Sequence, residues 1–501
     1  MEFVQSVLAG VFNPAVLMYI MLGVAGGICI GALPGLTATM GVALLLPLTF
    51  GMDAQTGILL LLGIYIGAIY GGSISAILLK TPGTPASAAT ALDGYEFSKR
   101  GEGGRALGIA TVSSFVGGVV SCIALMLISP QLAKLALKFS SAEFFLLAVF
   151  GLTIIASISG NKISKGLICG FIGMIIATVG IDSITGKVRY TFGSVSLMSG
   201  VSYIPVMIGL FAMSQAFISI EDIWTKEEVD NKVTKVIPSK EDLKKILKTA
   251  PLTGLIGTFI GIIPGAGADI GAFVSYNTAK NMSKTPEKFG TGITEAIAAS
   301  EGGNNGVTGG AMIPMLTLGI PGDAVAAIMI GALTIQGLNP GPLLFQNDKV
   351  LVYTIFVGLL VANCCMLLLG LSCLKAFTKV LTIPKTILTP IIFVLCIVGS
   401  YAIKNDFFDV GVMLVFGIIG YFMQKAEIPA SPAILGLILG PMAEKHFRTA
   451  LLKSGGNYGI FFSSAICWLF ILLAVGTLVL PIVKSMIAKS KAKKAAQSSS
   501  L

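Results

Sequence analysis

The sequence predicts an all-α polytopic membrane protein with about 10–12 transmembrane segments, built as two inverted-topology repeats that contain re-entrant or broken helices. Composition is the first reason, because 54% of the 501 residues are hydrophobic and only 12% are charged. A soluble domain has about 25% charged residues. The second reason is that apolar stretches of spanning length recur along the chain, and about 20 such residues cross a bilayer as a helix. Examples are Leu351–Leu374, Ile387–Ile403 and Tyr458–Val483.

Paired helix breakers inside apolar sequence are the third reason. The motif Ile30-Gly-Ala-Leu-Pro-Gly35 returns as Ile260-Gly-Ile-Ile-Pro-Gly265. A second break follows each of them, Thr81-Pro-Gly-Thr-Pro85 in the first case and Ile320-Pro-Gly-Asp323 in the second. Irregular backbone at membrane depth is tolerated only where it is buried in protein or lines a cavity. Paired interruptions in two halves of a chain therefore point to a transporter's binding site.

The order of apolar and polar sequence divides the chain into four parts. Residues 1–220 form the first membrane half and residues 250–484 the second. Between them, 221–249 contains seven Lys and seven acidic residues, a balance that predicts a solvated cytoplasmic connector. The Lys-, Ala- and Ser-rich end, 485–501, has the composition of a disordered chain. We expect it to be a basic cytoplasmic tail.

Basic residues in the loops predict opposite orientations for the two halves. In the first half, Gly51–Gln55 has no Lys or Arg, whereas the next loop, Tyr95–Arg105, has three. In the second half the order is reversed: Lys280, Lys284 and Lys288 follow the Pro-Gly motif, and the stretch from there to position 348 has neither Lys nor Arg. Because basic loops stay in the cytoplasm, the two halves should be inverted repeats, as in many secondary transporters.

Arm lengths predict that the second Pro-Gly motif is the tip of a re-entrant hairpin. About 30 residues separate the Lys-rich connector from the Lys-rich loop, which leaves two arms of about 14 residues, or about 21 Å each. The hydrocarbon core is about 30 Å thick. Neither arm crosses it upright, so the tip near 264–268 should stop close to mid-membrane. By symmetry, Val16–Phe50 should form a matching hairpin with its tip near 34–37, although its first arm is longer.

The breaks predict a carboxylate-binding site. A broken helix leaves unpaired N–H groups at the start of its second arm, and such groups bind anions. The alternative is that Pro and Gly merely kink membrane helices, but four breaks in a repeated pattern favour a site. The predicted substrate-binding residues are Pro34, Gly35, Thr37, Thr39, Pro82, Gly83, Thr84, Ser87, Pro264, Gly265, Asn304 and Asn305.

Three carboxylates near the breaks of the second half predict a coupling-ion site. Asp269 and Asp323 follow the breaks directly, and Glu301 begins the run Glu301-Gly-Gly-Asn-Asn305. A carboxylate repels a bound anion but is a ligand for a cation, so these residues are expected to serve Na⁺ or H⁺. For the two Asp residues, a first-turn position that suits the helix dipole is an equally good interpretation.

Nothing in the sequence predicts an enzyme, a cofactor or a nucleic-acid partner. His446 is the single histidine, the eight cysteines form no CxxC motif, and no Ser/His or Asp/Asp pair has a catalytic spacing. The formal charge of +10 resides in short loops and the tail. Basic residues there are typical of cytoplasmic loops beside anionic lipid. The lipid bilayer, not nucleic acid, is the partner that this charge predicts.

Four motifs in order resemble the large transmembrane (permease) subunit of tripartite tricarboxylate transporters, and the likeness covers essentially the whole chain. They are Pro34-Gly-Leu-Thr-Ala-Thr-Met-Gly41, Thr81-Pro-Gly-Thr-Pro-Ala86, Gly261-Ile-Ile-Pro-Gly-Ala-Gly267 and Glu301-Gly-Gly-Asn-Asn305. The resemblance implies about twelve transmembrane segments, a small four-helix membrane subunit and a periplasmic solute-binding protein as partners. It also implies an ion gradient as the energy source.

The resemblance further implies import of a carboxylate across a bacterial inner membrane by a multi-pass protein, and the basic tail predicts that its C-terminus is cytoplasmic. The residues that match the family's motifs are Pro34, Gly35, Thr37, Pro82, Gly83, Pro264, Gly265, Asn304 and Asn305. A stand-alone secondary carrier or channel for small organic anions, without a binding protein, is the alternative function. The identity of the carboxylate does not follow from the sequence.

Overall fold

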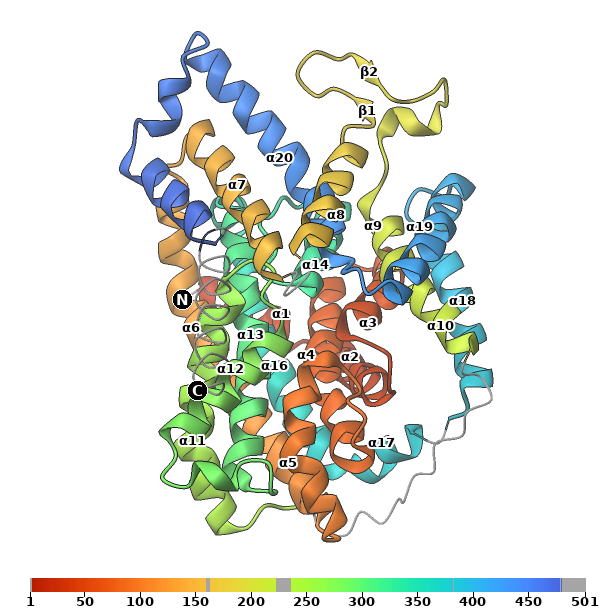
Figure 1. The fold of residues 1–501 in the computed structure, drawn as a ribbon, viewed down its shortest axis with the longest axis vertical. Coiled ribbons are helices and arrows are strands. Elements are labelled where there is room, and N and C mark those ends of the chain that lie inside the picture. The colour runs from red at the N-terminus through yellow and green to blue at the C-terminus, as the bar shows by residue number, and fades with distance from the viewer. Residues whose placement is uncertain (1, 159–162, 222–235, 382, 478, 480–501) are drawn as a thin grey trace, which may run out of the picture. The chain divides into compact units, whose positions relative to one another are not determined.

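The computed structural model describes residues 2–158, 163–221, 236–381, 383–477 and 479. The chain forms two compact units, each made from two segments of sequence (Figure 1). Unit 1 consists of Met1–Leu137 and Ile204–Phe422, and unit 2 of Lys138–Tyr203 and Met423–Leu501. These units differ from the predicted membrane halves, which concern topology across the membrane and stay a prediction.

Unit 1 contains most of the helices and all four of the sequence breaks. Its α-helices before the connector are α1 (Glu2–Val11), α2 (Pro14–Ala32), α3 (Ala38–Leu45), α4 (Ala54–Leu79), α5 (Ala88–Lys99), α6 (Gly103–Ala136), α9 (Tyr203–Met207) and α10 (Ser214–Glu221). Those after it are α11 (Lys240–Ile262), α12 (Ala268–Met282), α13 (Thr294–Leu318), α14 (Ala324–Ile335), α15 (Leu344–Asn347), α16 (Lys349–Ser372), α17 (Leu374–Val380), α18 (Lys385–Ala402) and α19 (Phe407–Lys425). Short 3₁₀ turns at Leu46–Thr49, Pro85–Ser87 and Pro286–Lys288, and a π-helical segment at Ile208–Met213, complete the unit.

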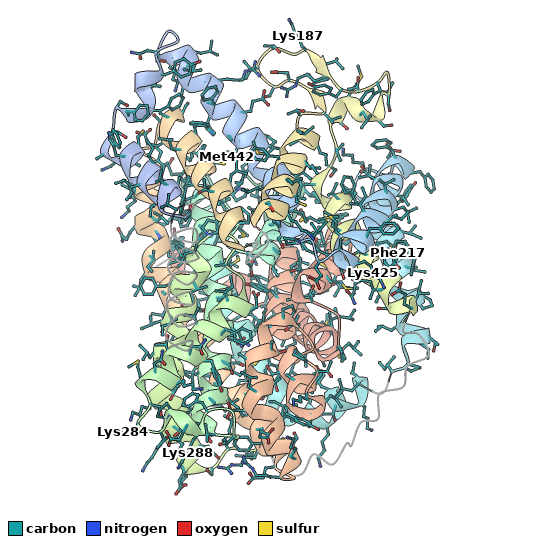
Figure 2. The ribbon with its side chains drawn as sticks, viewed as in Figure 1. Lys187, Phe217, Lys284, Lys288, Lys425 and Met442 are labelled. Carbon is teal, nitrogen blue, oxygen red and sulfur yellow. The ribbon has the colours of Figure 1, made fainter. Side chains whose placement is uncertain are left out.

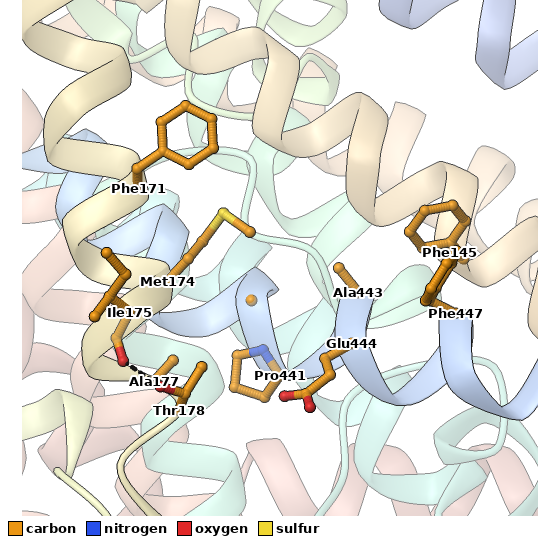
Figure 3. Close-up of a pocket in the computed structure, with 11 residues that line it drawn as sticks. Phe145, Phe171, Met174, Ile175, Ala177, Thr178, Pro441, Ala443, Glu444 and Phe447 are labelled. Carbon is orange, nitrogen blue, oxygen red and sulfur yellow. Dashed lines mark hydrogen bonds between the residues drawn. The ribbon is translucent and has the colours of Figure 1, made fainter. Parts of the chain in front are cut away.

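Unit 2 is smaller and combines three main helices with one β-hairpin. The helices are α7 (Ser141–Ile158), α8 (Ile163–Ile176) and α20 (Ser431–Lys453), with 3₁₀ turns at Ser196–Ser199 and Tyr458–Phe462 and a further apolar helix at Ala465–Thr477. Strands β1 (Gly180–Ile181) and β2 (Val188–Arg189) pair antiparallel. Helices α7, α8 and α20 surround an apolar cavity of about 470 Å³, and Glu444 lies beside Pro441 in its wall (Figure 3).

The prediction of an all-α polytopic membrane protein is confirmed. Six of the described helices are long and apolar enough to cross a membrane, and seven shorter apolar helices accompany them. The six spans are Pro14–Ala32, Ala54–Leu79, Gly103–Ala136, Tyr203–Glu221, Lys349–Ser372 and Phe407–Lys425. The apolar part of helix α4 is completely buried inside unit 1. Helices α2, α3, α5, α6, α13, α14 and α16 pack against it.

Close glycine contacts join α2 to α4. Gly23, Gly27 and Gly31 follow one another at four-residue intervals and so share one face of α2. A methyl group on Gly27 would lie 2.3 Å from the carbonyl oxygen of Ile64, and Gly23 and Gly31 are equally crowded. Small residues at this spacing allow the backbones of two membrane helices to approach closely.

Helices α11 and α13 pack in the same manner after the connector. A methyl group on Gly257 would lie 2.0 Å from the carbonyl oxygen of Gly303, and one on Gly310 would lie 2.4 Å from that of Thr258. The pair α11–α13 thus repeats the packing of α2–α4. In each pair, the first helix ends at a Pro-Gly motif and the second ends at the following break.

Helix α11 is longer than the arm of about 14 residues that its apolar sequence predicts. It begins at Lys240 because Ser239 and Asp242 form a capping box, which starts the helix within the polar connector. The apolar arm from Ala250 onward is a continuation of this charged first part. Of the predicted connector 221–249, residues 222–235 lie outside the described residues, as does the whole predicted tail 485–501.

Candidate functional site

The first Pro-Gly motif forms a tight turn between α2 and α3. Helix α2 ends at Ala32, and Gly35 adopts φ = +88°, a left-handed conformation that favours glycine. Thr37 is the N-cap of α3, where its Oγ1 accepts the N–H of Met40 at 3.1 Å. Pro34, Thr37 and Thr39 are partly exposed. They are thus accessible at the tip that the sequence predicts.

The second Pro-Gly motif makes the same turn between α11 and α12. Gly265 has φ = +79°, and the helix restarts at Ala268 after Gly267. Unlike Thr37, Gly267 has no side chain to cap the helix, so the first N–H groups of α12 have no side-chain acceptor from the cap. Asp269 lies in this first turn and is partly exposed, while Pro264 is buried.

Each later break packs against the first glycine of the Pro-Gly motif that precedes it. A methyl group on Gly83 would lie 2.0 Å from the carbonyl oxygen of Gly31. A methyl group on Gly322 would lie 2.5 Å from the carbonyl oxygen of Gly261. In addition, the N–H of Gly265 donates to the carbonyl of Gly322 at 2.6 Å. Breaks that lie about fifty residues apart in sequence are therefore adjacent in space.

Contacts between the helices also bring the two sets of breaks together. Helix α12, which follows the second tip, contacts the 3₁₀ turn Pro85–Ser87 of the first set. Helix α14, which follows the last break, contacts α3 behind the first tip. Asn304 of α13 donates from Nδ2 to the carbonyl of Ala86 at 3.4 Å. All four interruptions thus converge on one region of unit 1.

The predicted residues of the Thr-Pro-Gly-Thr break are mostly buried. Pro82 is partly exposed, whereas Gly83, Thr84 and Ser87 are buried. Ser87 donates from Oγ to the carbonyl of Thr84 at 2.8 Å. The hydroxyl of Thr84 has no hydrogen-bond partner among the described residues. A buried hydroxyl without a hydrogen-bond partner is uncommon in a folded protein. A ligand bound at this break would give the Thr84 hydroxyl a partner.

Glu301 is fully buried and is held by hydroxyl groups from three other helices. Its Oε1 accepts from Ser73 Oγ of α4 and Thr90 Oγ1 of α5, each at 2.5 Å, and its Oε2 accepts from Ser114 Oγ of α6 at 2.7 Å. Asn304 Nδ2 adds a longer contact of 3.4 Å. No Lys, Arg or His pairs with Glu301 within the described ranges.

Asn305 is buried beside Asn304. Its Nδ2 donates to Asn304 Oδ1 at 2.6 Å and to the carbonyl of Glu301 at 3.2 Å. Its Oδ1 has no partner in the part of the chain that the structure describes. The asparagine pair thus connects Glu301 to the first set of breaks through Ala86.

Asp323 occupies a different environment from Glu301. It is the N-cap of α14, with Oδ1 accepting the N–H of Ala326 at 2.7 Å and Oδ2 accepting the hydroxyl of Tyr65 at 2.5 Å. Tyr65 and Ser73 both belong to α4 and are eight residues apart, which corresponds to about 12 Å along the helix. The structure therefore does not bring Asp323 and Glu301 into one cluster.

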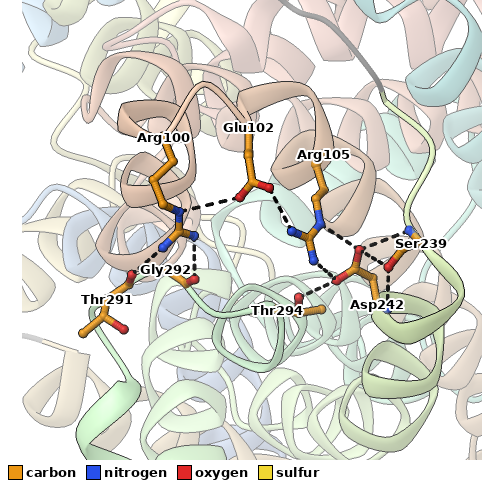
Figure 4. Close-up of polar contacts among 8 residues, drawn as sticks. All are labelled: Arg100, Glu102, Arg105, Ser239, Asp242, Thr291, Gly292 and Thr294. Carbon is orange, nitrogen blue, oxygen red and sulfur yellow. Dashed lines mark hydrogen bonds and ion pairs between the residues drawn. The ribbon is translucent and has the colours of Figure 1, made fainter.

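Charged networks away from the breaks hold the ends of the helices. Asp93 of α5 is buried and accepts the hydroxyl of Tyr276 at 2.8 Å as well as backbone N–H groups from Gly290, Gly292 and Ile293. Figure 4 shows the neighbouring polar contacts, which connect the chain between α5 and α6 to the starts of α11 and α13. They join Arg100, Glu102 and Arg105 to Ser239, Asp242, Thr291, Gly292 and Thr294.

Sequence reasoning missed the partners of the buried carboxylates. None of these partners lies in a break. Tyr65 and Ser73 lie inside α4, Ser114 lies inside α6, and Thr90 lies in the first turn of α5. For the partners in α4 and α6, hydroxyl groups inside otherwise apolar helices were the available signal, because such groups hydrogen-bond across membrane helices. Their pairing with Glu301 and Asp323 spans 187–258 residues of sequence, so periodicity could not reveal it.

The fold is that of a polytopic helical membrane protein, and paired breaks that converge inside such a fold are typical of transporters. The model of the tripartite tricarboxylate transporter TctA family matches residues 17–435. This chain belongs to that family, as the four motifs predict.

Two relatives from Agrobacterium vitis extend the comparison. The chain is 35% identical over 477 residues to an uncharacterized 52.8 kDa protein in the TAR-I ttuC' 3' region, an alignment that covers 95% of both chains. It is also 35% identical over 233 residues to an uncharacterized protein in the TAR-II ttuC' 3' region, covering 46% of this chain and 96% of that protein. No solved structure matches the chain.

Proposed function

We propose that this protein is the large membrane subunit of a secondary transporter that imports tricarboxylates or related carboxylates, driven by an ion gradient. The observation that carries the proposal is the convergence of two Pro-Gly tips and two later breaks in unit 1. Helix N-termini at such breaks hold anionic groups of transported substrates. The uncapped start of α12 and the hydroxyls of Thr37, Thr39, Thr84 and Ser87 would bind the carboxylate groups.

The remaining predicted residues have supporting roles in the proposal. The glycines and prolines at positions 34, 35, 82, 83, 264 and 265 let the backbone approach the substrate, and Asn304 and Asn305 face the bound anion. One or more of Asp269, Glu301 and Asp323 binds the coupling Na⁺ or H⁺. The matching turns at Gly35 and Gly265 and the matching contacts of Gly83 and Gly322 support two inverted repeats.

Membership of a tripartite transporter family supports the rest of the proposal, which follows the resemblance described above. A tripartite system has two further components, a small four-helix membrane subunit and a periplasmic solute-binding protein that delivers the carboxylate. The chain then lies in the bacterial inner membrane as a multi-pass protein with its C-terminus in the cytoplasm.

Uptake by the reconstituted complex tests this function. Proteoliposomes that contain the complex should accumulate labelled carboxylates only when the binding protein and an ion gradient are both present. Uptake without the binding protein would instead favour a stand-alone carrier, and uptake that requires ATP would contradict the mechanism.

Variants of the carboxylates test the coupling part. Asp269→Asn, Glu301→Gln and Asp323→Asn each remove one negative charge at nearly constant shape. At least one should change how uptake depends on Na⁺ or pH. If all three keep the cation dependence of the unmodified protein, the coupling assignment is wrong.

A further inference from the structure

The hydroxyl groups around Glu301 form a compact cluster with a distinctive geometry. Ser73, Thr90 and Ser114 donate to a carboxylate that is fully buried, and they come from three helices that precede the connector. A buried carboxylate is costly unless donors or a bound cation compensate its charge. Here neutral donors supply that compensation, and the charge of Glu301 joins α13 to α4, α5 and α6.

Distances between the oxygens favour a proton as the ligand of Glu301. The hydroxyl oxygens lie 2.5–2.7 Å from the carboxylate oxygens. A metal ion such as Ca²⁺ binds oxygen at about 2.3–2.6 Å and so separates neighbouring ligand oxygens by about 3 Å or more. Na⁺ has a similar size. A proton, by contrast, fits within the observed hydrogen bonds.

The donors can also adapt to a protonated Glu301. When a proton binds one carboxylate oxygen, a hydroxyl that donated to that oxygen turns to accept from it. The hydroxyl hydrogen then needs another acceptor, and the carbonyl four residues earlier in the helix provides one. Thr111 and Ser113, beside Ser114 in α6, already donate to such carbonyls at 2.8 Å and 2.7 Å.

Other ionisable groups on the surrounding helices have partners of their own. Tyr70 of α4 shares a hydrogen bond with Thr111. Asp93 of α5 accepts from Tyr276 of α12, and Arg105 of α6 pairs with Asp242 of α11. None of these side chains hydrogen-bonds Glu301 in the described residues, so its charge state depends on the hydroxyl cluster.

We propose that Glu301 is the proton-binding site through which carboxylate uptake is coupled to a proton gradient. The ionised carboxylate accepts from α4, α5 and α6 and holds α13 against them. Binding of one proton reverses or breaks at least one of these hydrogen bonds and weakens that contact, so the helices that carry the breaks move only in one protonation state. This inference rests on the proposed function and names the ion and residue that serve it.

Labelled citrate, a tricarboxylate, is the probe for the first test, with the complete complex in proteoliposomes free of Na⁺. One proton per substrate predicts that accumulation changes about tenfold for each pH unit of gradient, because tenfold corresponds to about 1.4 kcal/mol. Glu301→Gln should still exchange internal for external citrate but lose this gradient-driven accumulation. Ser113→Ala, whose hydroxyl donates only to the carbonyl of Ile109, is the matched control and should keep it.

Each outcome separates the inference from the proposed function. Gradient-driven accumulation by Glu301→Gln at the unmodified level overturns the inference. Accumulation driven only by Na⁺ in the unmodified complex also overturns it, but leaves ion-driven carboxylate import standing. Failure of the unmodified complex to take up any carboxylate overturns the proposed function itself.

A second measurement needs neither substrate nor the Glu301 variant. An infrared pH titration of the purified full-length chain, between about pH 5 and about pH 9, should show a protonated carboxyl group appearing as pH falls. Ser114→Ala removes one donor to the ionised form, so the midpoint of this titration should move to higher pH. Ser113→Ala should leave the midpoint unchanged, and identical titrations in the two variants overturn the inference.

Discussion

Asp323 illustrates how a carboxylate in a membrane helix break can serve the backbone directly. It caps α14 through Ala326 and accepts the hydroxyl of Tyr65. Asp323→Ala leaves a buried N–H and a buried hydroxyl without partners, which should lower the free energy of unfolding by about 1–3 kcal/mol. Denaturation in detergent measures this. Asp348→Ala is the control, because Asp348 precedes α16 without making a capping hydrogen bond. Equal effects of the two substitutions would contradict the structural role.

Asp182 provides a pH-dependent contribution to the stability of unit 2. It lies between β1 and β2, where the backbone N–H groups of Thr185 and Ile184 and the guanidinium of Arg448 hold its pKa well below the usual value. A lowered pKa means that the stabilisation is present above about pH 4, near the unfolded value, and is lost as pH falls further.

The melting temperature of the purified chain should therefore decrease more steeply from about pH 5 to about pH 3 than that of Asp182→Asn, which lacks this charge. At neutral pH the variant should be less stable than the unmodified chain. Parallel pH profiles for the two proteins would show that Asp182 does not contribute.

The contact between α2 and α4 depends on which face of α2 carries each glycine. Gly27 lies against the backbone of Ile64, whereas a methyl group on Gly26 would meet nothing within 4 Å. Gly27→Ala should separate the helices and cost at least about 1–3 kcal/mol of stability. Gly26→Ala should instead stabilise the helix by about 0.5–1 kcal/mol. Thermal unfolding and uptake measure both effects, and a destabilised Gly26→Ala would refute the packing argument.

Topology across the membrane is the property on which the inverted-repeat proposal depends. Gly51 follows the first hairpin and Lys284 follows the second, and both are exposed. Lys284 projects outward with Lys288 from the segment between α12 and α13 (Figure 2). Because basic loops remain in the cytoplasm, these two equivalent positions should lie on opposite sides of the membrane.

Cysteine labelling tests this topology in a chain whose eight native cysteines are replaced by alanine. A membrane-impermeant maleimide added to intact cells should label Gly51→Cys but label Lys284→Cys only after permeabilisation. Labelling of both positions from the same side would mean that the halves share one orientation.

Much of the fold was predictable from local sequence. The low fraction of charged residues and the apolar stretches predicted the membrane class, and the Pro-Gly motifs located the turns at Gly35 and Gly265. The residues at which helices begin depend on N-capping hydrogen bonds, and a hydropathy pattern does not reveal these bonds. For example, Ser239 and Asp242 extend α11 into the connector.

The candidate site was predictable only in part. The breaks themselves were recognisable, because Pro followed directly by Gly interrupts the helix at each of them, whereas single residues such as Pro130 and Gly27 remain inside helices. The separation of Glu301 from Asp323 was not, because it depends on Ser73 and Tyr65 of α4. In the sequence, both residues are acidic side chains near a break, so their different surroundings could not be predicted.

Residue order alone determined the membrane class, the family and the positions of the breaks, since these follow from side-chain polarity and backbone conformation over a few neighbouring residues. The packing of helices from both sides of the connector decided which groups surround each carboxylate. Hydrogen bonds between residues about 200 positions apart form only when glycine faces allow the helices to approach closely. That geometry is what distinguishes Glu301, held by hydroxyls from three other helices, from Asp323, bound to the end of a helix.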